Sequence, residues 1–114
     1  MDFSTNGAEY IDQTAGVSRI GGNLALYKRL LGRFVEGNHY EELERAILNG
    51  DMENAALLAH SLKGVSANLS LVKISSITVE LEQLLKNNAD HSLCLDELKQ
   101  AYSITLEQIS EILG

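Results

Sequence analysis

Residues 55–69 decide the fold, and they read AALLAHSLKGVSANL. With a rotation of about 100° per residue, the larger apolar residues of this stretch collect on one side of a helix and His60 falls on the other. The core side is expected to comprise Ala55, Leu58, Leu62, Val65 and Leu69. Because a helix with one apolar side needs other helices to cover it, the stretch predicts a helical bundle.

The side of this helix that carries His60 is expected to face solvent or a partner. Its other members are Glu53, Ala56, Leu57, Lys63, Gly64 and Ala67. A glycine inside a helix is about 1 kcal/mol less favourable than alanine, and close approach of another surface is a reason to keep one. Lys63 lies one turn from His60, where its ammonium would stabilise an anionic group on the imidazole.

An exposed imidazole can act as a nucleophile, a proton shuttle or a metal ligand. A neutral ring nitrogen attacks phosphorus readily, so an unhindered histidine with a nearby cation suits a phosphoryl acceptor. From the geometry alone, a surface histidine without a role is the more common alternative.

Cap and turn residues divide the rest of the chain into helices. A short helix is expected over residues 8–14, and a long one from the cap Asn23 to residues 49–50, weakened at residues 37–38. Asp51 is expected to cap the helix that carries His60, which ends near Leu69. A fourth helix covers residues 74–85, and a fifth, capped by Asp90, runs to residue 113.

These segments predict an all-α fold, an antiparallel four-helix bundle with a short additional helix near the N-terminus. The chain has 114 residues and no proline, and residues 1–114 are expected to form a single domain with a loose terminus at residues 1–7. Tyr27, Phe34 and Tyr102, at helical spacing, are expected in the core.

The charge balance excludes some functions. Nine basic and 16 acidic residues give a net charge of −7, which repels nucleic-acid phosphates and anionic lipids. The longest apolar run has five residues, at 55–59, and residues 1–13 lack the apolar segment of a signal peptide. We therefore expect a cytoplasmic monomer that neither inserts into membranes nor binds nucleic acid.

The remaining candidate residues favour ordinary roles. His39 and His91 are expected at the surface, and Cys94 in the core as a small filler. Arg29 and Arg33 either help to dock an acidic partner or belong to a solvated face, the more common case. No inward Glu-x-x-His pair occurs, so we expect no metal site. The G-x-x-x-x-G-K-[ST] loop is also absent, so we expect no nucleotide binding. The acidic residues expected on solvated faces are Glu80, Glu82, Asp96, Glu97, Glu107 and Glu111.

Residues 59–69, AHSLKGVSANL, resemble the phosphoacceptor helix of histidine-containing phosphotransfer (Hpt) domains, the phosphorelay intermediates of two-component systems. Residues 16–23, GVSRIGGN, with the apolar residues up to Phe34, resemble the N-terminal segment of that family. Leu81 and Glu82 also fit its pattern, and the resemblance runs over residues 8–88.

The resemblance implies an antiparallel four-helix bundle in which His60 is phosphorylated on Nε2. Lys63 would be the cation near the phosphoryl group, and Gly64 the small residue that admits the partner. The metal ion and the donor aspartate would belong to a receiver domain, so this chain is expected to need no cofactor. Ser70 departs from the family, which often has glycine there, and this leaves the end of the His60 helix open.

We therefore expect a phosphorelay intermediate without kinase activity. It would accept a phosphoryl group from a phospho-aspartyl receiver and pass it to another, with docking contacts from Ala56, Leu57, Ala67, Arg29 and Arg33. A hybrid sensor kinase is a further possible partner. Two alternatives stay open: a phosphoacceptor domain cut from a larger hybrid or chemotaxis-type kinase, and a helical docking or regulatory module that carries no phosphate.

Overall fold

The computed structural model describes residues 10–114, and this part of the chain folds into helices without strands. The all-α expectation is confirmed. The helices are α1 (Gln13–Arg19), α2 (Leu24–Glu36), α3 (His39–Leu48), α4 (Met52–Asn68), α5 (Val72–Lys86) and α6 (Ser92–Leu113).

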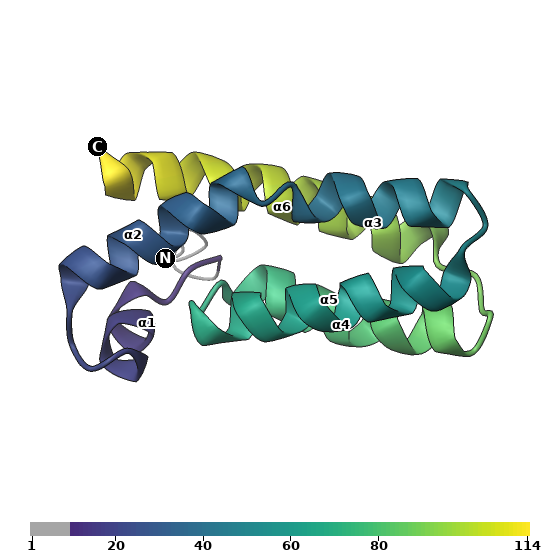
Figure 1. Ribbon diagram of the computed structural model, residues 1–114, viewed down its shortest axis with the longest axis horizontal. Helices are drawn as coiled ribbons and strands as arrows, with labels where there is room; N and C mark the ends of the chain where they lie inside the picture. The colour runs from purple at the N-terminus through teal and green to yellow at the C-terminus, as the bar shows by residue number, and fades with distance from the viewer. Residues whose placement is uncertain (1–9) are drawn as a thin grey trace, which may run out of the picture.

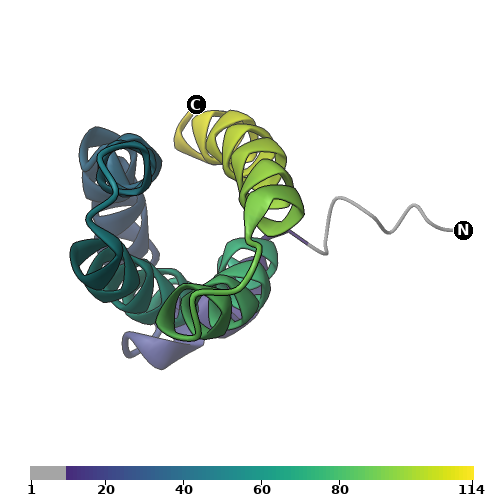
Figure 2. The ribbon, with the colours of Figure 1, turned by 90° about the vertical axis from the view of Figure 1, so that its right-hand side faces the viewer.

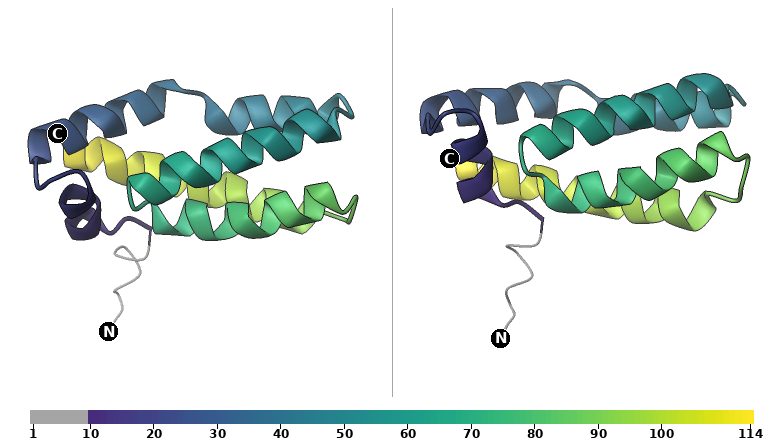
Figure 3. Two further views of the ribbon diagram at one scale, coloured as in Figure 1. Left: turned by 60° about the horizontal axis from the view of Figure 1, so that its bottom comes forward. Right: turned by 90° about the horizontal axis from the view of Figure 1, so that it is seen from below.

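The helices pack side by side in chain order (Figure 1). α2 and α3 follow each other along one long side, α4 turns back beside α3, and α5 lies against α4 in the most extensive contact between elements. α6 then packs against α5, as the end view in Figure 2 shows, and it also contacts α2. α1 lies across one end of this arrangement, next to α2 (Figure 3).

Large apolar side chains from α2 to α6 fill the space between the helices, and each fully buried one contributes roughly 1.5–3 kcal/mol. Tyr27, Phe34 and Tyr102 are all buried, as expected. The large side chains less than 2% exposed include Tyr27, Leu31, Leu43, Leu62, Leu71, Ile74, Leu81, Leu98 and Ile109.

Side-chain caps fix two of the helix starts as expected. Asn23 Oδ1 accepts a hydrogen bond from the backbone N–H of Leu26 at 3.0 Å, and Asp51 Oδ1 accepts one from that of Asn54 at 3.3 Å. The expectation for α6 is wrong by one position, because His91 is its N-cap. The Asp90 carboxylate instead accepts hydrogen bonds from the backbone N–H of Ser92, two residues ahead, at 3.0 Å and from the Ser92 hydroxyl at 2.9 Å.

The first helix lies later than the sequence indicated. The expected helix over residues 8–14 is wrong: α1 begins at Gln13, after the cap Asp12, while residues 8 and 9, like the loose terminus expected at 1–7, lie outside the described residues. Gly16 lies inside α1, where a Cβ would come within 2.5 Å of the Tyr27 ring. This glycine therefore allows α1 to approach α2 closely.

The helix expected to run from Asn23 to residues 49–50 is interrupted at residues 37–38. The structure therefore has two helices there, α2 and α3. Asn38 has the left-handed backbone conformation, with φ of 53°, which a short polar side chain tolerates. The His39 ring then folds back over Gly37 and stacks on Phe34, with ring centroids 4.8 Å apart. His39 is thus half-buried rather than a plain surface residue, and burial lowers its pKa. His91, at the start of α6, is half-buried as well.

The turn between α4 and α5 resolves the question raised by Ser70. Ser70 has a φ of 57°, and the N–H of Leu71 donates a hydrogen bond to the Ser66 carbonyl at 2.8 Å. This is the left-handed helix C-terminus that glycine usually forms, and here serine forms it. Arg19 Nη1 donates to Ser70 Oγ at 2.6 Å and to the Ala67 carbonyl at 2.7 Å. α1 therefore holds the C-terminal end of α4.

We predict that Ser70→Ala lowers the free energy of unfolding by about 1–2 kcal/mol, since it removes an acceptor for a charged donor and keeps the left-handed backbone. Ser70→Gly loses the same hydrogen bond but relieves the backbone, so it should be about 1 kcal/mol more stable than Ser70→Ala. Urea unfolding of the three proteins measures both differences. A glycine variant no more stable than the alanine variant would contradict this account.

Candidate functional site

His60 projects from α4 with 64% of its side chain exposed. The outward position agrees with the helical pattern, but the core side of α4 is rotated by about 40° from the expected one. Ala59 and Ser66 are buried there, whereas Leu58 and Val65 are only half-buried. The rotation brings the His60 side of α4 nearer to the neighbouring helix.

That neighbour is α5, and it supplies a carboxylate to the imidazole. His60 Nδ1 lies 3.0 Å from Oε2 of Glu82, a residue only 2% exposed. An ionised carboxylate can only accept, so Nδ1 carries the proton and donates it. In the neutral ring, Nε2 then keeps its lone pair and is the nitrogen able to act as a nucleophile.

Two lysines share this carboxylate with His60. Lys63 Nζ lies 2.9 Å from Glu82 Oε1, and Lys86 Nζ lies 2.8 Å from Oε2. Hydrogen bonding from Lys86, then from Lys63, lowers the pKa of Glu82 to about 2, although burial opposes this. Glu82 is therefore ionised at neutral pH.

The expectation that Glu82 lies on a solvated face is wrong. Glu82 follows Thr78 by four residues and precedes Leu85 by three, and both of these are buried, so it lies on the core-facing side of α5. This spacing could have revealed its position, but the pattern was dominated by the larger residues Ile74, Ile77 and Leu81. Lys86, four residues ahead, was a further indication of a paired carboxylate.

Lys63 and Gly64 lie beside His60 as the sequence indicated. Lys63 is 33% exposed and pairs with Glu82 in this state, so its ammonium is already held close to the imidazole. Gly64 is exposed, and a Cβ added to it would meet no atom within 4 Å. Within the described part of the chain, no contact with another segment thus requires glycine at position 64.

His60 lines the larger of two grooves that border α4. One of about 650 Å³ lies between α4 and α5, and its lining includes Ala56, Leu57 and Lys86 as well as His60 and Glu82. Another of about 280 Å³ lies between the α2–α3 junction and the end of α4, with Arg33 in its lining. Of the other expected docking residues, Ala67 is exposed on α4, and Arg29 is exposed on α2 but lines neither groove.

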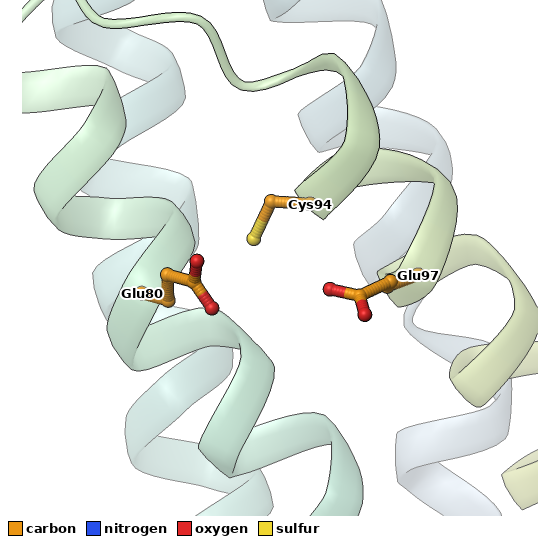
Figure 4. Close-up of side chains that lie close together, drawn as sticks. All are labelled: Glu80, Cys94 and Glu97. Atoms are coloured by element: carbon orange, nitrogen blue, oxygen red, sulfur yellow. The ribbon is translucent and has the colours of Figure 1, made fainter.

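Figure 4 shows a separate cluster of Glu80, Cys94 and Glu97, whose potential ligand atoms all lie within 4.8 Å of one another. Cys94 is buried, as expected, and its thiol donates a weak hydrogen bond to the Ile77 carbonyl at 3.7 Å. Burial raises the pKa of this thiol to about 11, so it is protonated at neutral pH and a poor ligand. The cluster by itself does not indicate a metal site.

We predict that Glu82 makes the stability of the fold sensitive to acid. Its pKa is about 2 in the folded state and 4.5 unperturbed, so its contribution is complete above pH 4.5 and disappears as the pH falls towards 2. Because the lysine partners are partly exposed, we expect a contribution of about 2 kcal/mol. Glu82→Gln should reduce the free energy of unfolding at pH 6 by this amount and by much less at pH 2.5.

Urea unfolding between pH 2.5 and pH 6 measures this difference, with Glu80→Gln as the control because Glu80 is an exposed carboxylate on the same helix. A stability difference between wild type and Glu82→Gln that is the same at every pH would contradict the assignment.

A family model described as "Hpt domain" matches residues 31–112, which cover most of the chain and include His60, Lys63, Gly64 and Glu82. Comparisons with curated proteins and with solved structures gave no match. Within residues 10–114, no helix is both long enough and apolar enough to cross a membrane.

Proposed function

The chain belongs to the Hpt domain family, whose members serve histidine phosphotransfer in two-component phosphorelays, and on this premise we propose that His60 is its phosphoacceptor. The donor would be a phospho-aspartyl receiver domain, and a second receiver would later remove the phosphoryl group. The observation that carries the proposal is an exposed imidazole whose Nδ1 is engaged by a buried carboxylate, which leaves Nε2 free.

In the proposed step, the Nε2 lone pair attacks the phosphorus in line with the bond to the aspartyl oxygen. The P–N bond forms as that P–O bond breaks, and the aspartate leaves as a carboxylate. No proton has to leave the ring, because Nδ1 keeps its hydrogen and the positive charge on the imidazole is stabilised by Glu82. Lys63 would turn from Glu82 to the incoming phosphoryl oxygens, and the receiver would supply Mg²⁺.

The surface around His60 suits such a partner. Ala56 and Leu57 form an apolar patch in the larger groove. Gly64 and Ala67 are exposed on α4 and have small side chains, so they leave room for a partner to approach. α2 carries Lys28, Arg29 and Arg33 against one acidic residue in a chain of net charge −7. We propose that this locally basic helix faces the acidic phosphorylation site of the receiver.

We propose that the chain acts as a carrier without kinase activity of its own. In this account, α2 with α3, then α4, α5 and α6, form the four antiparallel rods of the family, and α1 is the additional helix. A monomer presents the His60 surface to one receiver at a time, so that donor and acceptor use it in turn.

Incubation with a phosphorylated receiver and Mg²⁺ tests the proposal. The protein should acquire label that is lost in acid and retained in base, as expected of phosphohistidine, and addition of a second receiver should remove it. Absence of label with several phosphorylated receivers, or label with the opposite acid and base stability, would reject the proposed function.

A further inference from the structure

Lys86 belongs to the cluster around Glu82, but it lies on α5 and outside the segment that resembles the phosphoacceptor helix. Its ammonium contacts Oε2 of Glu82 at 2.8 Å, the same oxygen that His60 Nδ1 contacts at 3.0 Å. Lys63 contacts the other oxygen, Oε1, at 2.9 Å. The two lysines therefore have different relations to the imidazole.

The two lysines reach Glu82 from different helices. Lys63 contacts Oε1 from α4, the helix that also carries His60. Lys86 is four residues from Glu82 on the same helix and stays within reach whatever Lys63 does. It is also the largest single cause of the lowered pKa of Glu82.

A buried carboxylate is strongly destabilised when its last cation leaves. If Lys63 turns to the phosphoryl group, as the proposed function requires, Glu82 needs a counter-ion that remains. The groove beside His60 is also lined by Glu53, a second carboxylate, which adds negative charge. Lys86 is the cation in that lining.

We propose that Lys86 is a positioning residue that acts through Glu82: it keeps the carboxylate on Nδ1 of His60, and thereby keeps Nε2 unprotonated, while Lys63 is released. The inference about transfer rests on the proposed function. The inference about the position of the ring proton does not, because that proton is present before any phosphoryl group arrives.

¹⁵N NMR of the ring nitrogens of His60 in the intact protein, at a pH where the ring is neutral, measures the two tautomers directly. Lys86→Met should lower the ratio of Nδ1–H to Nε2–H by about fivefold, as expected when one charge-assisted hydrogen bond is weakened. Lys86→Arg, which restores a cation, should recover most of the ratio. Lys73→Met is the matched control, because Lys73 is an exposed lysine of α5 without an ion pair among the described residues.

Transfer from a phosphorylated receiver should slow in Lys86→Met by the factor by which the fraction of the Nδ1–H tautomer falls, and the same spectra measure that fraction. A tautomer ratio that stays at the wild-type value in Lys86→Met, or falls equally in Lys73→Met, would overturn the role of Lys86. Failure of the wild-type protein to accept a phosphoryl group would instead count against the proposed function, so the two failures are distinguishable.

Discussion

His60→Gln is expected to take up no label from a phosphorylated receiver. The glutamine amide nitrogen has no lone pair available for attack on phosphorus, so the loss should be complete within detection rather than partial. The fold should survive, since the side chain is 64% exposed and an amide N–H can still donate to Glu82. We expect the midpoint of thermal unfolding to move by only a few degrees.

The control for this variant is His91→Gln, which removes a half-buried histidine at the start of α6. It should accept label at the wild-type rate and with the same acid and base stability. Equal labelling of His60→Gln and wild type would reject His60 as the acceptor even if the protein does carry phosphate. Loss of label in both variants would show that the assay reports damage to the fold.

The sequence predicted the helices best where local physics determines them. Asn23 and Asp51 begin their helices because their side chains accept the first free N–H groups, and local spacing is enough to recognise this. The first helix was placed too early because its position depends on packing: Gly16 lies inside α1 and allows close contact with Tyr27, which is eleven residues away in sequence. A helical pattern along one segment cannot reveal a contact with another segment.

At the site, too, the sequence predicted what one helix determines and missed what depends on packing between helices. The exposure of His60 follows from the spacing of apolar residues on α4 alone. Its pairing with Glu82 depends on how α4 and α5 pack. Glu82 was predicted to be exposed because it is a charged residue. Ser70 could not be settled from sequence either, since serine tolerates its left-handed backbone with support from Arg19, 51 residues away.

Gly64→Leu is expected to slow phosphoryl transfer by about 100-fold, the loss typical of a reacting group displaced by about 1 Å. A leucine one turn from His60 would stand on the surface that the receiver has to approach. The protein itself should gain stability, by somewhat less than 1 kcal/mol, because leucine favours the helix over glycine and the added Cβ meets no atom within 4 Å. Transfer and stability are thus expected to change in opposite directions.

A series of smaller changes separates steric obstruction from altered helix stability. Gly64→Ala and Gly32→Ala each replace a glycine inside a helix, at a position where the added Cβ has open space around it. Both should raise the free energy of unfolding by about 1 kcal/mol. Only the Gly64 variants should slow transfer by obstruction beside His60, and leucine more than alanine, because Gly64 lies one turn from His60 on α4 whereas Gly32 lies on α2. Transfer by Gly64→Leu at the wild-type rate would show that the receiver does not approach over this part of α4.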